Sequence, residues 1–328
     1  MRGVAPLRRV LGVIFDMNYV LFIGHRYGEQ LLALMLRQGL RVAYAFIEKD
    51  AADERVRYFD ALCARCEQNG VPYSADLSAA NQCAVLSDIS PDVILVYGFR
   101  RIIREEAFRL AKHGALAMHY ALLPRYRGFA PVNWAMINGE TETGVSLFYL
   151  NSGEVDSGDL VAQARVPIGP DEDIGQVLQK CDACAMDIFS AQLPLFERGI
   201  FAATPQEERL ATYTCARTAE DGQIQWTQST RQIYDLIRAT TDPFPCAFTR
   251  VGGAAGQANT LLRVLDAEIY PVGNYVGRIP GRVIKILPNT GIVVLTADGA
   301  LLIKRVRTES GEVTTADTLC KSVRMRCE

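Results

Sequence analysis

GALAMHYALLPRYRGFAPVNWAMINGETETGVSLFYLNSGEVDSGD, residues 114–159, contains the pattern that decides the fold. Its first apolar run, Ala115–Met118, predicts a buried strand, and His119 stands where that strand ends. A second strand is expected over Gly144–Leu150, followed by an acidic loop that contains Asp156. Ligands and chemistry are usually found on the loops at the strand ends of an α/β sheet. We therefore expect His119 and Asp156 to meet across one cleft.

The residues on either side of this stretch alternate between short apolar runs and runs with helical spacing. Such alternation is typical of a doubly wound parallel sheet, so we expect a Rossmann-like α/β domain. No G-x-G-x-x-G follows the first expected strand and no Walker loop occurs, which argues against a dinucleotide or P-loop site. The expected strands are Val10–Phe15, Arg41–Ile47, Val93–Tyr97 and Leu160–Val166, and the expected helices are Tyr27–Gln38, Arg55–Asn69, Asp76–Ser90, Pro131–Ile137 and Ile174–Arg198.

From Tyr213 onward the pattern changes to short runs separated by Gly, Asn and Pro. After one capped helix, Ser229–Ala239, four runs have the spacing of antiparallel strands in a small barrel. They are Leu261–Leu265, Gly281–Leu287, Gly291–Thr296 and Leu301–Val306. The chain is therefore predicted to contain an α/β domain at 1–205, a β-barrel domain at 206–308 and a polar tail at 309–328.

Length and composition exclude several classes of protein. The chain has 328 residues, 49% of them hydrophobic, which is enough for two domains with their own cores. A net charge of −2 and a pI of about 6.0 give no sign of a broad nucleic-acid footprint. No apolar run approaches the roughly 18 residues that a membrane span needs. The basic and apolar start of the chain lacks the cleavage site of a signal peptide, so we expect a cytoplasmic protein with no membrane partner.

The cysteines raise the question of a metal or redox site. The pairs Cys63/Cys66 and Cys181/Cys184 have the C-x-x-C spacing of such sites and could in principle hold zinc. Both pairs, however, lie in runs with helical spacing, without the Gly and Pro of zinc ribbons. The total of nine cysteines is odd, and in a chain without a secretion signal this favours reduced thiols. We therefore expect no metal.

The quoted stretch resembles the signature of the folate-dependent formyltransferases, roughly N-x-H-x-S-L-L-P-x-[YW]-R-G, then N-G-E-x-x-T-G-V, then D-x-G-D. The likeness extends over nearly the whole chain, because the text from Thr218 onward is similar to the start of the family's C-terminal domain. The resemblance implies a Rossmann-like domain followed by a small OB-like β-barrel, and a transferase that uses 10-formyltetrahydrofolate as co-substrate. The matching residues are His119, Leu122–Pro124, Tyr126–Gly128, Asn138–Glu140, Thr143–Val145, Asp156, Gly158 and Asp159.

The same resemblance implies roles for individual residues. His119 and Asp156 match the family's catalytic histidine and aspartate. A histidine can accept and return a proton near neutral pH, and an adjacent carboxylate can orient its ring. The loop that follows the strand Val93–Tyr97 corresponds to one that forms the pocket for the pterin ring of the folate, and such a ring needs an apolar slot. The residues expected to bind the co-substrate are Tyr97, Gly98, Phe99, Ile102, Leu122 and Val155.

One position departs from the family pattern, because the catalytic asparagine, two residues before the histidine, is replaced by Ala117. The family's asparagine donates a hydrogen bond to the developing oxyanion, and alanine has no donor. Loss of one such donor commonly costs about 10²–10³ in rate. Three alternatives stay open: a transferase that uses another donor, a different one-carbon or acyl transfer, and a binding-only pseudoenzyme.

The amine acceptor is the remaining question. Methionyl-tRNA formyltransferases tend to carry a basic insertion after the second strand, whereas the equivalent Ile47–Arg55 is short and acidic, which disfavours tRNA. The text at 90–94, 130–134 and 242–245 is more similar to nucleotide-sugar N-formyltransferases, including the one that acts on UDP-4-amino-arabinose. We therefore expect a nucleotide-linked amino sugar as the acceptor, with methionyl-tRNA as the alternative. A homodimer formed by a helical hairpin or by the barrel would be compatible with this pattern.

Overall fold

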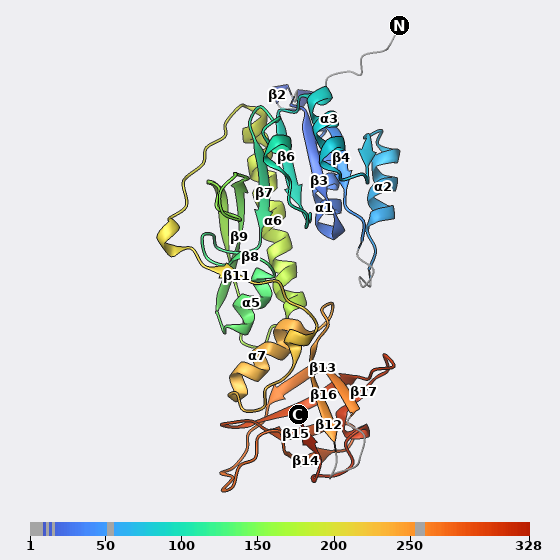
Figure 1. Cartoon of the computed structure of the whole chain (residues 1–328), viewed down its shortest axis with the longest axis vertical. Helices are drawn as coiled ribbons and strands as arrows, with labels where there is room; N and C mark the ends of the chain where they lie inside the picture. The colour runs from blue at the N-terminus through green and yellow to red at the C-terminus, as the bar shows by residue number, and fades with distance from the viewer. Residues whose placement is uncertain (1–8, 11–12, 15–16, 51–55, 253–259) are drawn as a thin grey trace. The chain divides into compact units, whose positions relative to one another are not determined.

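The computed structural model describes residues 9–10, 13–14, 17–50, 56–252 and 260–328 (Figure 1). The chain packs into two compact units. The first unit contains residues 1–127, 144–166 and 180–213, and the second contains residues 128–143, 167–179 and 214–328. The two units interleave along the sequence, because two internal segments are grouped with the C-terminal residues.

The first unit is built on a mixed seven-stranded sheet in the order β10-β9-β7-β6-β3-β4-β5. Strands β3 to β7 pair in parallel, and β9 pairs with β7 in the antiparallel direction. Within this sheet the chain begins at β3, an interior strand, and winds out to both sides, which confirms the predicted doubly wound α/β fold. The strands are β3 (Tyr19–Ile23), β4 (Val42–Ile47), β5 (Tyr73–Ser74), β6 (Val93–Tyr97), β7 (Ala115–His119), β9 (Glu142–Tyr149) and β10 (Leu160–Pro167).

Helices cover both faces of this sheet, and side-chain alternation along the strands shows which face each helix takes. Phe22 and Val96 pack on one face in an apolar cluster with residues of α3 and α4. On the opposite face, Ile23 lies so close to α1 that only glycine fits at position 28 of the helix, and Tyr97 packs on Phe189 of α6. The helices are α1 (His25–Arg37), α2 (Phe59–Gln68), α3 (Ala79–Ile89), α4 (Glu105–Phe108) and α6 (Ile174–Glu197).

The first strand of the sheet lies later in the chain than the pattern predicts. Part of the predicted strand Val10–Phe15, residues 11–12 and 15, lies outside the described residues. Arg9–Val10 (β1) and Val13–Ile14 (β2) pair with each other, and the large sheet begins with β3, whose five side chains are all buried. The prediction is wrong because two apolar runs lie close together, and periodicity alone does not show which one joins the sheet. Residues 51–55 of the expected acidic segment also lie outside the described residues.

Among the residues described, the second unit contains the helices α5 and α7 and a seven-stranded sheet whose pairings are antiparallel. The strand order is β14-β15-β16-β13-β12-β18, with β17 on β16. A bridge between Arg282, next to β14, and Arg326 of β18 joins the two ends of this order, so the sheet is nearly closed into a barrel. The helices are α5 (Pro131–Ile137) and α7 (Thr230–Thr240), and the strands are β12 (Ala247–Gly252), β13 (Thr260–Ile269), β14 (Val283–Leu287), β15 (Gly291–Leu295), β16 (Ala300–Arg307), β17 (Val313–Thr315) and β18 (Arg326–Cys327).

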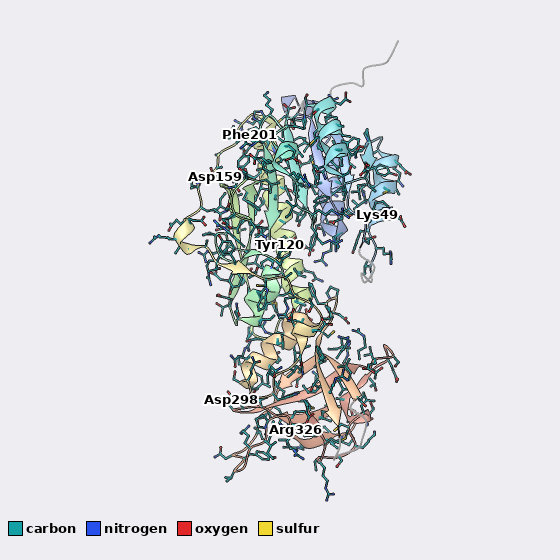
Figure 2. The ribbon with its side chains drawn as sticks, in the orientation of Figure 1. Lys49, Tyr120, Asp159, Phe201, Asp298 and Arg326 are labelled. Carbon is teal, nitrogen blue, oxygen red and sulfur yellow. The ribbon has the colours of Figure 1, made fainter. Side chains whose placement is uncertain are left out.

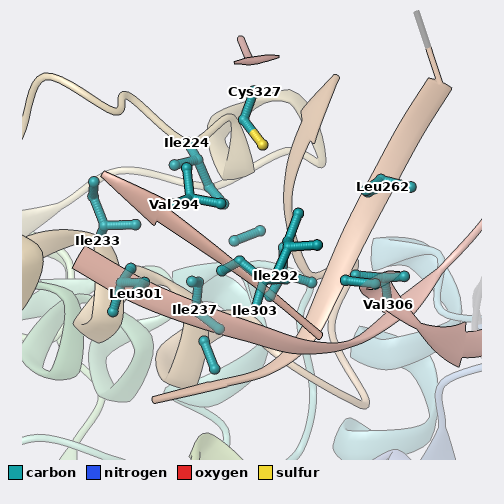
Figure 3. Close-up of a cluster of buried hydrophobic side chains, with 14 of the residues drawn as sticks. Ile224, Ile233, Ile237, Leu262, Ile292, Val294, Leu301, Ile303, Val306 and Cys327 are labelled. Carbon is teal, nitrogen blue, oxygen red and sulfur yellow. The ribbon is translucent and has the colours of Figure 1, made fainter. Parts of the chain in front are cut away.

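Apolar side chains from α7 and the strands form the core of the second unit (Figure 3). Ile233 and Ile237 are one turn apart on α7, so both reach the core and pack with Ile303 of β16. A capping box between Ser229 and Gln232 satisfies free N–H groups at the start of this helix. Residues 309–328, expected as a polar tail, supply β17 and β18 to the sheet, and Cys327 is buried in the same core.

Two short strands complete the described secondary structure relevant to the site: β8 (Arg127–Gly128) pairs with β11 (Tyr213–Thr214). Over the residues that the structure describes, no helix combines the length and the apolar character required to cross a membrane.

Candidate active site

The end of β7 and the loop after β9 bring together the two residues predicted to be catalytic. His119 is the last residue of β7, and Asp156 lies between β9 and β10. The Nδ1 atom of His119 is 3.5 Å from Oδ2 of Asp156. Both side chains are largely shielded from solvent, with 11% and 18% of their surface exposed. The structure therefore shows the expected approach of these two residues.

A hydrogen bond to the backbone identifies the ring nitrogen of His119 that carries a proton. Nε2 lies 2.8 Å from the carbonyl oxygen of Tyr126. A carbonyl oxygen only accepts, so the Nε2–H group donates this bond. Nδ1 then faces Asp156 at a distance longer than a direct hydrogen bond. Nδ1 is thus the ring nitrogen left to exchange a proton.

The backbone of the Asp156 loop has a conformation that few side chains tolerate. Asp156 has a φ of 52°, in the left-handed region. A Cβ added to Gly158 would lie 1.8 Å from the carbonyl oxygen of Tyr149, at the end of β9. Only glycine allows this approach, which brings the loop back against its own strand. The DSGD text therefore sets the path of the loop as well as supplying the carboxylate.

The loop after His119 is tied to the neighbouring strands by side-chain hydrogen bonds. The hydroxyl of Ser146 on β9 donates to the carbonyl of Ala121 at 2.7 Å. The amide of Gln163 on β10 donates to the carbonyl of Leu123 at 3.0 Å and to the Ser146 hydroxyl at 2.8 Å. These bonds hold the loop whose backbone accepts the hydrogen bond from the His119 ring.

Tyr97, predicted to line the co-substrate pocket, points into the interior on the face covered by α1 and α6. Its hydroxyl lies 2.5 Å from the hydroxyl of Tyr120, which donates to Oδ1 of Asp182 on α6 at 2.7 Å (Tyr120 is labelled in Figure 2). Nε of Arg26 on α1 lies 3.0 Å from the other oxygen of Asp182. Because the Tyr120 proton goes to Asp182, Tyr97 is the donor between the two hydroxyls.

Burial controls the charge states in this cluster. Desolvation raises the pKa of Tyr97 and the pKa of Tyr120 far above the usual range of a phenol. Desolvation also raises the pKa of Asp182, although the hydrogen bond from Tyr120 and the charge of Arg26 oppose this shift. The two tyrosines are therefore neutral donors at neutral pH. Asp182 and Arg26 match no motif, and the sequence carries no signal for them beyond the helices on which they lie.

The loop after β6 begins with a close approach of two backbones. Gly98 has a φ of 68°, and a Cβ there would lie 2.5 Å from the carbonyl oxygen of Gly24, which follows β3. The buried carboxylate of Glu48 accepts the backbone N–H of Arg100 at 2.8 Å and lies 3.5 Å from Nε of Arg100 and of Arg101. The sequence analysis did not predict that Glu48 holds this loop, because its partners, Arg100 and Arg101, are distant in the chain.

The other residues predicted to bind the co-substrate differ in exposure. The ring of Phe99 packs edge-on against Phe22 at 5.3 Å. Leu122 is half-buried, whereas Ile102 and Val155 are 91% and 52% exposed. Val155 directly precedes Asp156, so one large exposed apolar side chain is the sequence neighbour of the candidate catalytic carboxylate.

Ala117 lies two residues before His119 on β7, so alternation places both side chains on the same face of the sheet. Ala117 is 9% exposed and belongs to an apolar cluster that includes Val96 and Phe148 on the flanking strands. The side chain at this position therefore offers a methyl group where the family's pattern has an amide donor.

The cysteines of the C-x-x-C pairs lie on helices, as expected, and are free thiols. Burial raises the pKa of Cys66 to about 12 and the pKa of Cys181 to about 12, so both thiols stay protonated at neutral pH. In the part of the chain that the structure describes, no group of three or more His, Cys, Asp and Glu side chains could hold a metal ion.

Three solved structures are similar to this chain in fold. The N-formyltransferase from Helicobacter canadensis, solved with folinic acid and dTDP-3-aminofucose, has a TM-score of 0.65 at 13% identity, covering 88% of this chain and 98% of that chain. The 4-N formyltransferase from Francisella tularensis has a TM-score of 0.56 at 14% identity, covering 69% and 89%. HypX from Aquifex aeolicus, in complex with tetrahydrofolic acid, has a TM-score of 0.59 at 20% identity, covering 94% and 47%. This chain therefore spans about half the length of HypX, and at these identities the likeness shows the fold alone.

Two family models match the sequence in chain order. The one described as formyl transferase covers residues 25–193, and the one described as formyl transferase, C-terminal domain, covers residues 217–324. The first match contains His119, Asp156 and the whole motif region, and it spans more than half of the 328 residues. The resemblance inferred from the motifs is thus confirmed, and the chain belongs to the formyltransferase family.

Proposed function

We propose that this protein is a folate-dependent N-formyltransferase, which moves a formyl group from 10-formyltetrahydrofolate to the amine of a small acceptor. The observation that carries the proposal is the His119–Asp156 pair, with 3.5 Å between Nδ1 and Oδ2, inside the region that the family model matches. The pair combines a group that can exchange a proton near neutral pH with a carboxylate that can stabilise the charged ring.

The co-substrate supplies the formyl group and the nitrogen that leaves. Two exposed apolar side chains support a site for its ring system: Ile102 after β6 and Val155 after β9. The close approach of Gly98 to Gly24 supports it as well, because it keeps side chains out of the start of the same loop. The proposed binding residues remain Tyr97, Gly98, Phe99, Ile102, Leu122 and Val155.

His119 is proposed to move the proton during transfer. The attacking amine loses a proton as the new C–N bond forms, and the departing folate nitrogen gains one as the old C–N bond breaks. Nδ1 can carry this proton, because Nε2 is already committed to the carbonyl of Tyr126. Asp156 stabilises the proton on Nδ1. Since Ala117 has no donor, another group must stabilise the negative charge that develops on the formyl oxygen.

We infer that the acceptor is a nucleotide-linked amino sugar. The sequence text around Pro131 and Pro243 supports this class, as does the Helicobacter canadensis N-formyltransferase of similar fold, which was solved with dTDP-3-aminofucose. A pI of about 6.0 favours a small molecule over methionyl-tRNA, the alternative acceptor. The proposal includes a cytoplasmic location, no nucleic-acid or membrane partner, and a homodimer.

A binding-only pseudoenzyme is the second candidate, and Ala117 is the observation that favours it. Its methyl group sits in an apolar cluster on the same face as His119. Such a protein would bind folate and nucleotide sugar without turnover.

The test is the release of tetrahydrofolate from 10-formyltetrahydrofolate, measured with a panel of nucleotide-linked amino sugars and with methionyl-tRNA. Wild type, Ala117→Asn and His119→Ala would be assayed together. We expect acceptor-dependent turnover by wild type with an amino sugar, and its loss in His119→Ala. Activity in Ala117→Asn alone would favour a disabled site. Turnover with methionyl-tRNA alone would overturn the proposal that the acceptor is an amino sugar. Ligand binding without turnover in any of the three proteins would favour the pseudoenzyme.

A further inference from the structure

Residues 204–213, here called the strap, follow the first unit's last helix, α6. The strap pairs with the first residue of β10, because Leu160 and Thr204 exchange two backbone hydrogen bonds of 2.8 Å. It therefore lies against the strand that follows the Asp156 loop.

Side chains of the strap form hydrogen bonds with a fully buried arginine of the LLPRYRG motif. Arg127 has a relative exposure of 0%. Its Nη1 and Nη2 each donate to one oxygen of the Glu208 carboxylate at 2.8 Å, and Nη1 also donates to the Tyr213 hydroxyl at 3.0 Å. Its Nε and Nη2 donate to Oε1 of Gln206 at 3.2 and 2.9 Å. The hydrogen bond with Glu208 raises the pKa of Arg127, so the guanidinium stays charged and acts only as a donor.

This arginine determines which way the Gln206 amide points. A guanidinium has no acceptor, so it must face the amide oxygen, and the amide nitrogen must then face the other way. That nitrogen donates to the carbonyl oxygens of Asp156 at 2.8 Å and of Gly158 at 2.6 Å. Arg127 is thereby connected through one side chain to the backbone that carries the Asp156 carboxylate.

The other end of the strap holds the acceptor of the His119 ring. The Thr212 hydroxyl accepts the backbone N–H of Tyr126 at 2.8 Å, and the Thr212 carbonyl accepts that of Arg127 at 2.9 Å. Tyr126 has a φ of 59°, a left-handed conformation that its neighbours must maintain. The Tyr126 carbonyl is the group that accepts the Nε2–H bond of His119.

We propose that Gln206 and Thr212 of the strap are positioning residues that set the geometry between His119 and Asp156. Gln206 holds the carboxylate's backbone, Thr212 holds the carbonyl that orients the imidazole, and Arg127 fixes the two relative to each other. The inference rests on the proposed function in one respect, because the pair matters for rate only if it moves a proton in formyl transfer. Small displacements of such groups lower rates strongly, since proton transfer depends on distance and alignment.

Gln206→Glu tests the first half of the strap with little change in size. The variant keeps an acceptor for Arg127 but places a carboxylate oxygen against two carbonyl oxygens, so the Asp156 loop should move. We expect kcat to fall about 10- to 100-fold with a smaller change in KM. Glu207→Gln is the matched control, because this neighbouring carboxylate is exposed and its side chain pairs with Arg209. The control should keep wild-type kcat.

Thr212→Val tests the second half, with Thr212→Ser as the conservative rescue. Valine removes the acceptor for the Tyr126 N–H, whereas serine keeps it. If the role of Thr212 were merely structural, Thr212→Val would have a lower melting temperature, and its kcat would not fall independently of KM. A positioning role predicts a loss of kcat in Thr212→Val that Thr212→Ser restores. Equal kcat in Thr212→Val and wild type, or in Gln206→Glu and wild type, would overturn the inference.

A readout without turnover separates this inference from the proposed function. The protein has three histidines, so the ring signals of ¹⁵N-histidine-labelled protein can be resolved by NMR. The His119 signals should shift in Gln206→Glu and in Thr212→Val, while those of His113, stacked on Phe201 at 4.3 Å, stay in place. Unchanged His119 signals in both variants would overturn the inference whether or not the wild type is active. If the His119 signals shift in the variants but the wild type transfers no formyl group, the result would instead count against the proposed function.

Discussion

His119 and Tyr120 are neighbours in the chain, yet they contact two separate carboxylates on opposite faces of the sheet. Nδ1 of His119 lies 3.5 Å from Asp156, while the Tyr120 hydroxyl donates to Asp182 at 2.7 Å. Alternation at the end of β7 produces this split, because successive side chains point to opposite faces. Substitutions at the two residues should therefore have distinguishable effects, on rate at the first and on stability at the second.

Asp156→Asn should lower kcat by about 10²–10³ while leaving the melting temperature close to that of wild type. The amide keeps the size of the side chain but removes the negative charge that stabilises a proton on Nδ1 of His119. Steady-state kinetics with a saturating acceptor would measure the effect. Glu154→Gln, an exposed carboxylate two residues away, is the control and should behave as wild type. Equal losses in both variants would contradict a specific role for Asp156.

Gly158→Ala should disrupt the same loop through the backbone. Its Cβ would lie 1.8 Å from the carbonyl oxygen of Tyr149, a contact that only a backbone shift can relieve. We expect a loss of kcat of about 10-fold or more, because the shift moves the Asp156 carboxylate. Gly153→Ala is the matched control in the same loop, since its nearest neighbour outside the adjacent residues would be 3.4 Å away. Wild-type kcat in Gly158→Ala would show that the loop can relax without moving the carboxylate.

Tyr120→Phe should destabilise the first unit by about 1–3 kcal/mol, because Asp182 and Tyr97 both lose a buried hydrogen-bond partner. Tyr97→Phe breaks the bond between the hydroxyls but keeps the one between Tyr120 and Asp182, so its cost should be smaller. Urea unfolding of the two variants and the wild type measures both values. A larger cost for Tyr97→Phe would contradict the direction that we assign to this chain of hydrogen bonds.

Asp182→Asn should change how stability depends on pH. Burial raises the pKa of Asp182 in the folded protein, so between about 4 and this raised value the folded state binds more protons than the unfolded state. This group's contribution to stability is therefore fully present below about pH 4 and is lost as pH rises through the folded-state pKa. Asparagine does not titrate, so the stability of Asp182→Asn relative to wild type should increase with pH over that window. Parallel curves from urea unfolding at several pH values would contradict this.

Ile303→Ala should destabilise the second unit by about 2–5 kcal/mol, because it leaves a cavity in the buried cluster shown in Figure 3. Ile303 is 1% exposed and packs with the buried face of α7. Ile279→Ala, at 44% exposure, removes the same atoms from the surface and should cost far less. Denaturant unfolding followed by the fluorescence of Trp226, in the same cluster, would report the difference. Similar costs at both positions would argue against a well-packed core.

Local pattern was sufficient for the elements whose periodicity is clear. The strand Val93–Tyr97 and the helix Pro131–Ile137 have the predicted limits, and the predicted strand Leu160–Val166 differs from β10 by one residue. His119 and Asp156 could be paired in advance because each closes or follows a strand within one continuous motif region. The first strand was misplaced because the two apolar runs before residue 24 are alike in length and composition.

Sequence by itself determined the family, the doubly wound α/β fold and the pair of candidate catalytic residues, because these depend on residue types at short, regular spacings. Only the tertiary structure showed which groups hold that pair: Gln206 and Thr212 of the strap, and Arg127 buried between them. It likewise revealed Asp182 behind Tyr120. These partners lie tens of residues apart in the chain, and polar side chains acquire their orientation from the folded surroundings. No local periodicity therefore records them.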